Sequence, residues 1–151
     1  MAVSTLGAAS VPLLTACATT GDSVAEVDSL IAQSRLARRD AARAAATIAR
    51  NPERAAALDL VRMQRTAHAD TLDVEIARLA ATYPADIATD TSASPSTSAA
   101  AATPGLDELR AGLAESQRSA ADSAQMLTAY RAGLCASISA ACATYLTVVL
   151  P

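Results

Sequence analysis

Apolar side chains recur along most of this chain at intervals of three, four or seven residues, the spacing that places them on one face of a helix. One such stretch spans 23–50 and a second spans 52–83. Between them, Asn51 suits the N-cap of a helix and Pro52 suits its first position. Because this connection is so short, we predict that the two helices pack as an antiparallel hairpin over 23–83.

The same periodicity resumes at Pro104 and continues almost to the end of the chain. A single helix of that length would be about 70 Å long, against about 45 Å for either helix of the first hairpin. Its unsupported half would expose a large apolar face to water. We therefore predict a turn near 128–133, where Gly133 is the one helix-breaking residue, and a second hairpin over 104–150. The expected fold class for 23–150 is one all-α domain, an antiparallel four-helix bundle.

The segment between the two hairpins, 84–103, differs in composition from its surroundings. It consists mostly of Ala, Ser, Thr and Pro, with hardly any large apolar side chain. Such a segment cannot bury enough apolar surface to form a core, so we predict a flexible, disordered crossover between the second and third helices. Its Ser and Thr residues are compatible with glycosylation, and a plain linker explains them equally well.

Composition supports a helical chain and argues against some partners. Of the 151 residues, 52% are hydrophobic but only 2% are aromatic, with no Phe and no Trp, and alanine supplies much of the apolar content. Alanine has the highest helix propensity, whereas strands favour β-branched and aromatic residues. The net charge of −3 disfavours nucleic acid as a partner, because a nucleic-acid-binding domain is usually basic.

Two cysteines, Cys135 and Cys142, lie seven residues apart on the last predicted helix. Their Cα atoms would be about 10.5 Å apart at the rise of an α-helix, whereas a disulfide needs less than about 7 Å. We therefore expect both to be buried thiols that pack as small apolar side chains.

The first sixteen residues form an uncharged apolar run that leads into Leu14-Thr15-Ala16-Cys17. These four residues resemble the lipobox of a bacterial lipoprotein signal, in which a leucine stands three residues before a cysteine and small residues lie between. The resemblance implies that 1–16 is a signal peptide removed by cleavage and that Cys17 receives a diacylglycerol group. The apolar run has a length typical of signal peptides and is short for a membrane span.

On this interpretation, the lipidated Cys17 and the tether 17–22 attach the bundle to the extracytoplasmic face of the cell membrane. The alternative is a buried helix that happens to contain a cysteine, and the polar segment 19–22 directly afterwards disfavours it. Signals usually open with Lys or Arg, and none precedes this run. Either the natural start lies upstream or the signal is a weak one.

One face of the second predicted helix carries the polar residues of most interest. Continuing the apolar stripe from Leu58 and Val61 places Arg65, His68 and Glu75 on the inward side. We interpret His68 as a hydrogen-bonded core residue, with Arg65 and Glu75 at the rim of the bundle. Arg65 would pair with Glu75 or with an acid from another helix.

Four long helices with one extended crossover resemble the ferritin-like bundles. More narrowly, the chain is similar to small alanine-rich exported proteins of actinobacteria, which have ferritin-like predictions and no established activity. The resemblance covers most of the mature chain and implies ferritin-like topology. It is carried by Arg65-Thr66-Ala67-His68, Glu75-Ile76-Ala77-Arg78-Leu79, Tyr130-Arg131-Ala132-Gly133-Leu134 and Ala141-Cys142.

The di-metal centre of ferritin-like proteins needs a Glu on each of two helices and a Glu-x-x-His motif on each of the other two. Here Arg65 stands where the motif needs Glu before His68, and the chain has no second histidine. Glu26, Glu108 and Glu115 fall beside the apolar stripes of their helices rather than on them. We therefore predict no bound metal, no cofactor and no catalytic residue.

Four basic residues, Arg35, Arg38, Arg39 and Arg43, share one face of the first predicted helix. Next to a lipid anchor, such a face could rest on anionic headgroups. A solvated face that pairs with Asp40 and neighbouring acids is the favoured interpretation.

The expected function is therefore that of a non-catalytic binding or structural module of the cell envelope, held by its lipid anchor and working with an unknown protein partner. The alternative is a degenerate ferritin-like metal-binding or oxidase protein.

Overall fold

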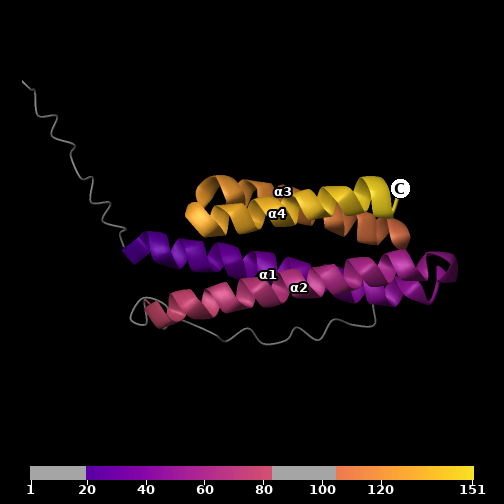
Figure 1. Ribbon diagram of the computed structural model, residues 1–151, viewed down its shortest axis with the longest axis horizontal. Helices are drawn as coiled ribbons and strands as arrows, with labels where there is room; N and C mark the ends of the chain where they lie inside the picture. Colours follow the sequence, from indigo (N-terminus) through magenta and orange to yellow (C-terminus); the bar gives the residue numbers. More distant parts are fainter. Residues whose placement is uncertain (1–19, 83–104) are drawn as a thin grey trace, which may run out of the picture.

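The computed structural model of the chain describes residues 20–82 and 105–151, and within these ranges its regular structure is helical throughout, with no strand. Four helices pack together (Figure 1), which confirms the all-α fold class. The predicted signal peptide 1–16, the lipidation site Cys17 and the predicted crossover 84–103 lie outside the described residues. The elements in chain order are α1 (Thr20–Ile48), the 3-10 turn η1 (Pro52–Arg54), α2 (Ala55–Thr82), α3 (Leu106–Met126), α4 (Ala129–Thr144) and the π-helical turn η2 (Tyr145–Val149).

The hairpin of α1 and α2 differs from the prediction in its details. α1 begins at Thr20, three residues before the predicted start, and it ends at Ile48. The side chain of Asn51 does not cap the following helix. Its Nδ2 instead donates a hydrogen bond to the carbonyl oxygen of Thr47 at 3.0 Å, so Asn51 closes the end of α1. Pro52 begins η1, where its missing N–H leaves no helical hydrogen bond unmade.

α3 and α4 are separate helices. The turn that joins them lies at 127–129, at the start of the predicted range 128–133. Leu127 and Thr128 are extended, and Ala129, the first residue of α4, has a φ of +50°. Gly133, the residue on which the predicted turn relied, lies inside α4 instead. A Cβ added at Gly133 would meet no atom within 4 Å, so neither a turn nor a close approach requires glycine there.

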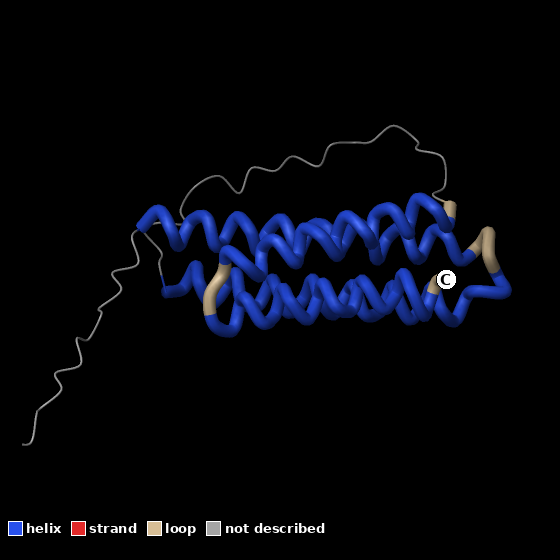
Figure 2. Tube along the Cα trace, turned by 90° about the horizontal axis from the view of Figure 1, so that it is seen from above, coloured by secondary structure: helices blue, strands red, loops and turns tan. Residues whose placement is uncertain are grey.

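Contacts between side chains give the directions of the helices. Ser34 of α1 hydrogen-bonds to Asp73 of α2, and Asp40 hydrogen-bonds to Arg65, so residue numbers fall along α2 as they rise along α1. Figure 1 shows α2 and α3 running back toward the end of the molecule where α1 begins, while α4 runs in the direction of α1. Figure 2, seen from above, shows the four helices side by side over most of their length.

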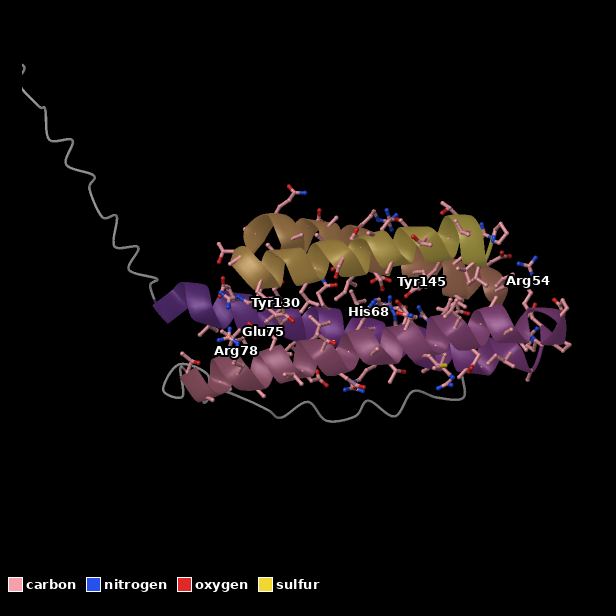
Figure 3. The ribbon with its side chains drawn as sticks, in the orientation of Figure 1. Arg54, His68, Glu75, Arg78, Tyr130 and Tyr145 are labelled. Atoms are coloured by element: carbon pink, nitrogen blue, oxygen red, sulfur yellow. The ribbon has the colours of Figure 1, made fainter. Side chains whose placement is uncertain are left out.

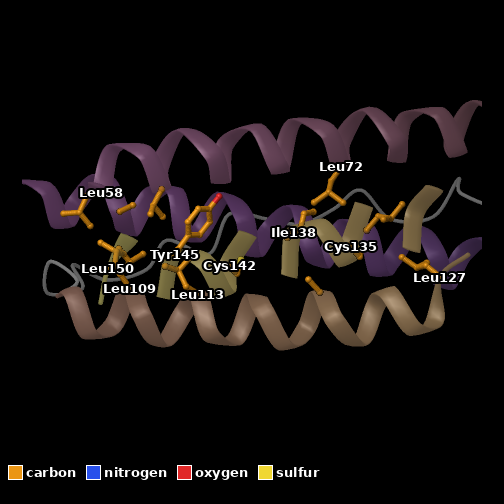
Figure 4. Close-up of a cluster of buried hydrophobic side chains, with 14 of the residues drawn as sticks. Leu58, Leu72, Leu109, Leu113, Leu127, Cys135, Ile138, Cys142, Tyr145 and Leu150 are labelled. Atoms are coloured by element: carbon orange, nitrogen blue, oxygen red, sulfur yellow. The ribbon is translucent and has the colours of Figure 1, made fainter. Parts of the chain in front are cut away.

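The core lies along the interior of the four helices (Figure 4), and the buried apolar residues are mainly leucine and alanine. Each fully buried leucine contributes about 1.5–3 kcal/mol, and alanine lets neighbouring helices approach closely. On α2, Leu58, Val61, Leu72 and Leu79 are buried at helical spacing, whereas Ile76 is only partly buried. On α1 the buried apolar residues are Val27, Leu30, Ala37, Ala41 and Ala44.

One described segment, Ala129–Val149, is long and apolar enough to cross a membrane, judged by length and composition alone. Core helices of soluble proteins pass the same test. In this structure the segment comprises α4 and η2, and it contributes Cys135, Ile138, Cys142 and Tyr145 to the core (Figure 4). Only 22% of its apolar window is buried inside the bundle, so packing between the helices accounts for only part of its apolar content.

Candidate functional site, a buried polar layer

A buried ion pair crosses the middle of the bundle. Asp40 of α1 and Arg65 of α2 have fully buried side chains, and the distance from Arg65 Nη2 to Asp40 Oδ2 is 3.0 Å. A charged group is rarely buried unless it is paired and hydrogen-bonded, because removing it from water is costly. The pairing explains why both charges can occupy the core.

A third helix also contributes a hydrogen bond to the carboxylate of Asp40. Ser116 of α3, also fully buried, donates a hydrogen bond to Asp40 Oδ2 at 2.5 Å. Asp40 Oδ1 lies 3.5 Å from Arg39 Nη2, which also donates to the carbonyl oxygen of Gly112 at 3.4 Å. A Cβ at Gly112 would lie 2.6 Å from Arg43 Nη1 and 3.2 Å from Asp40 Oδ1, so glycine there keeps room for the polar groups.

His68 extends this arrangement toward the surface. Its Nδ1 lies 3.2 Å from Arg65 Nη1, and because a guanidinium can only donate, Nδ1 accepts and the ring proton belongs on Nε2. Burial and the nearby Arg65 charge lower the pKa of His68 to about 4. The ring is therefore neutral at pH 7. We refer to Asp40, Arg65, His68 and Ser116 as the central layer.

Two weakly acidic groups lie close to the central layer. Burial raises the pKa of Cys142 to about 11 and that of Tyr145 to about 12, and the charge of Arg65 acts on both groups in the opposite direction. Figure 3 shows Tyr145 and His68 in the same region of the bundle. Burial also raises the pKa of Cys135 to about 11. Both cysteines are free, buried thiols, as the sequence predicts, and neither is activated as a nucleophile.

Glu75, the third residue of the predicted polar cluster, belongs to a different cluster nearer the end of the bundle. Its carboxylate accepts two hydrogen bonds of 2.7 Å from Arg78 and one of 3.4 Å from Arg131 of α4. Arg131 Nη2 also lies 2.8 Å from Glu26 Oε2 of α1. Figure 3 shows Glu75 and Arg78 together, away from His68. We refer to Glu26, Glu75, Arg78 and Arg131 as the end cluster.

Cations surround the carboxylate of Glu75 and favour its charged form. Its pKa is lowered, chiefly by the hydrogen bonds from Arg78, although partial burial acts in the opposite direction and Arg131 adds a smaller effect. The Glu75 side chain is 5% exposed.

Arg65 and Glu75 are both buried, as the predicted inward face of α2 requires, but the predicted position of both at the rim is wrong. Arg65 is not at the rim, since its side chain is fully buried, and Glu75 does not pair with it. The partner of Arg65 is an acid from another helix, the second of the two predicted alternatives. Glu75 lies far along α2 from Arg65, so the structure brings Arg65 and His68 together and places Glu75 elsewhere.

The sequence interpretation places Asp40 on a solvated face, whereas its side chain is fully buried in the structure. The signal was present, because Asp40 follows Ala37 by three residues and precedes Ala44 by four, and both alanines are buried. An acidic residue on an apolar stripe is easily assigned to the surface, since acids are almost never buried unless paired.

Three of the four basic residues on this face of α1 pair with acids of two neighbouring helices. Arg38 pairs with Asp70 and Asp73 of α2, whereas Arg39 pairs with Glu115 of α3 at 3.0 Å. Arg43 Nη2 lies 3.7 Å from Glu108 of α3. These pairs neutralise much of the positive charge that an anionic membrane surface would need. The solvated-face interpretation names Asp40 and neighbouring acids as partners. Arg39 does lie 3.5 Å from Asp40, but the other partners are acids of α2 and α3.

Within 20–82 and 105–151, no three His, Cys, Asp or Glu side chains gather closely enough to hold a metal ion. The central layer contains one carboxylate, one imidazole and a guanidinium whose permanent charge would repel a bound cation. The hydrogen bonds of the central layer join protein side chains to one another. They link α1 to α2 through Asp40 and Arg65, and α1 to α3 through Asp40 and Ser116.

Comparison with known proteins finds no matching family model, no matching curated protein and no matching solved structure.

Proposed function

We propose that this chain is a lipid-anchored, extracytoplasmic helical-bundle protein that acts as a non-catalytic binding or structural module of the cell envelope. The observation that carries the proposal is the sequence Leu14-Thr15-Ala16-Cys17 at the end of an uncharged apolar run. The first helix of the bundle begins at Thr20, three residues after Cys17, so Thr20, Gly21 and Asp22 belong to α1 and the predicted tether 17–22 is shorter than the sequence indicates. An anchor at Cys17 would therefore be joined almost directly to a packed domain.

We also propose that the bundle has ferritin-like topology. α1 and α2 form one hairpin, α3 and α4 form another, and α2 and α3 run in the same direction (Figure 1). The segment 83–105 therefore joins residues at opposite ends of the bundle. A long connection of this kind is what distinguishes ferritin-like bundles from up-and-down bundles with short loops.

The non-catalytic part of the proposal rests on how the interior is filled. In the described ranges, the buried carboxylates Asp40 and Glu75 are engaged by arginines, and the buried thiols have raised pKa values. A di-metal centre would need about four carboxylates and two imidazoles converging on one layer. In the central layer, Arg65 lies beside the single histidine instead.

The lipid anchor is tested by a pair of cysteine variants of the full chain expressed in bacteria. Cys17→Ala should abolish the processed, membrane-bound form and leave uncleaved precursor or released protein. Cys135→Ala, which removes a buried thiol, is the matched control and should leave processing and fractionation unchanged. The measurements are membrane fractionation, the intact mass of the product and incorporation of a labelled fatty acid. A processed Cys17→Ala chain that still fractionates with membranes would show that the lipobox interpretation is wrong.

The rival function is tested by metal analysis of the purified protein. We expect no stoichiometric iron, manganese or zinc in the wild type. Stoichiometric metal in the wild type that disappears in His68→Ala would favour the ferritin-like metal-binding or oxidase function instead.

A further inference from the structure

Two large apolar side chains are exposed around the turn between α3 and α4. Met126, the last residue of α3, is 82% exposed, and Tyr130 of α4 is 62% exposed. Exposed single apolar residues are common, but these two stand at the same turn. Tyrosine is the side chain that prefers a membrane–water boundary, since it has an apolar ring and a polar hydroxyl.

This turn lies at the end of the bundle where α1 begins. Ser29 of α1 hydrogen-bonds to Ser123 of α3 at 3.0 Å, and Glu26 pairs with Arg131 at 2.8 Å. Figure 1 shows the start of α1 and the α3–α4 turn at one end and the C-terminus at the other, and Figure 3 places Tyr130 toward the former.

The position of the proposed anchor, Cys17, just before α1 indicates which end of the bundle would face the membrane. Glu26 lies about 9 Å along α1 from Thr20, and Cys17 can lie at most about 10 Å beyond Thr20. The opposite end of α1, at Ile48, is about 42 Å from Thr20. An anchor at Cys17 would therefore hold the α3–α4 turn within about 20 Å of the lipid attachment, and the other end of the bundle much farther away.

The charges of the end cluster, which lies near this turn, are paired within the protein. The end cluster contains two carboxylates and two guanidiniums in mutual contact, so bringing it close to lipid would not leave an isolated charge without water. Asp28 and Asp122 are exposed on the adjoining turns of α1 and α3. A contact here would therefore depend on apolar insertion rather than on attraction to anionic headgroups.

We infer that Met126 and Tyr130 form a lipid-contacting tip, which rests in the headgroup region of the membrane that holds the N-terminal segment. This inference rests on the proposed membrane anchor and adds the orientation of the bundle on the membrane. It predicts that the tip touches lipid with or without anionic lipid, and that the end carrying the C-terminus remains in water.

The chain contains no tryptophan, so a single substitution provides a specific probe. Tyr130→Trp places the probe at the tip, and Val148→Trp places the matched control at the other end, where Val148 is 71% exposed. Each full chain is expressed in bacteria, purified from the membrane fraction and reconstituted into phosphatidylcholine vesicles with or without phosphatidylglycerol. Tryptophan emission is then recorded with and without brominated phosphatidylcholine.

The expected result is a shift of the tip probe to shorter wavelength and loss of most of its emission with brominated lipid, in both vesicle compositions. The control probe should show neither change. Adding Met126→Asp to the tip probe should restore its emission toward that of the control, while flotation with vesicles stays unchanged. All three substitutions replace exposed side chains, and circular dichroism checks that the helices are retained.

Three outcomes would overturn the inference while leaving the anchor intact. In each, the protein floats with the vesicles. The two probes are equally insensitive to brominated lipid, or both are quenched because the whole bundle lies on the surface, or the tip probe shifts without quenching because a second protein copy covers it. Absence of the wild-type protein from the membrane fraction would instead overturn the proposed anchor, and the lipid-contacting tip with it.

Discussion

The central layer and the end cluster use the same chemistry, arginine paired with carboxylate, in surroundings that differ in their exposure to water. Asp40 and Arg65 have no exposed surface, whereas in the end cluster Arg78 is 56% exposed and Arg131 and Glu26 are about one-fifth exposed. If one partner of the pair in the central layer is removed, water cannot reach the remaining charge. In the end cluster, water can reach a charge that has lost its partner, because part of the cluster is exposed. Burial, rather than the number of ion pairs, therefore decides how much each arginine contributes to stability.

The largest effect should come from removing one partner of the buried pair. Arg65→Met leaves Asp40 charged in the core and should lower the free energy of unfolding by about 3–5 kcal/mol, measured by urea denaturation. The double variant Asp40→Leu/Arg65→Met should recover most of that loss, because no buried charge remains. A double variant no more stable than Arg65→Met would mean that the pair contributes by shape and packing rather than by mutual neutralisation.

The central layer should also make stability depend on pH. The pKa of His68 is lowered to about 4 in the folded protein, against about 6.5 when unfolded, so the unfolded chain binds more protons between these values. Stability should therefore fall as the pH falls from about 6.5 to about 4, by about 2 kcal/mol once the partial exposure of the ring is considered. The check is a series of urea denaturations across this range.

His68→Gln keeps a side chain that can accept the hydrogen bond from Arg65 and cannot titrate. Its unfolding free energy should change little over the same pH interval. An equally steep pH dependence in this variant would assign the effect to other groups.

Glu75→Gln in the end cluster should have a smaller effect, lowering the free energy of unfolding by about 1–2 kcal/mol. Arg131 keeps Glu26 as a partner, and Arg78 can reach water. Because the pKa of Glu75 is lowered, its contribution is present above the unfolded pKa and is lost as the pH falls through the folded value. Glu75→Gln should therefore also reduce the acid sensitivity of the protein, measured by thermal denaturation at low pH. A loss as large as that of Arg65→Met would refute the distinction between the two clusters.

Arg38→Ala should have the smallest effect, at most about 1 kcal/mol. Arg38 pairs with Asp70 and Asp73, but all three side chains are about half exposed. The difference from wild type should shrink in high salt, which screens exposed charges. Thermal denaturation with and without added salt measures both effects, and a salt-independent loss would indicate that the side chain acts by packing.

The helices could be predicted because their apolar stripes are long and regular, as Leu58, Val61, Leu72 and Leu79 illustrate. The α3–α4 turn was less predictable, since it is made by Leu127, Thr128 and the positive φ of Ala129, and none of these residues marks a turn. Gly133 is the helix-breaking residue nearest to this turn, so the sequence predicts a turn that extends to Gly133, although Gly133 lies inside α4.

The candidate site was only half predictable for a related reason. Helical spacing brings Arg65 and His68 together within α2, so the sequence alone could pair them. The identity of Asp40 and Ser116 as their neighbours depends on which faces of α1 and α3 meet, and that register is set by the packing of whole helices. The spacing of Ala37, Asp40 and Ala44 places Asp40 on the buried face of α1, but it does not indicate which residue of another helix Asp40 contacts.

The hydrogen bonds between α1 and α3 have a consequence for the order in which the chain folds. Ser29, Gln33 and Asp40 meet partners on α3 that lie 76 to 94 residues away in sequence, whereas Asp40 and Arg65 are 25 residues apart. Closing the longer loops costs more chain entropy before any contact rewards it. We therefore expect each hairpin to form early from its own residues, with docking of the two hairpins as the late, slower step. Until that step, water would hydrate the side chains of Gln33, Asp40 and Ser116. Docking of the two hairpins would then have to displace this water from the surface between α1 and α3.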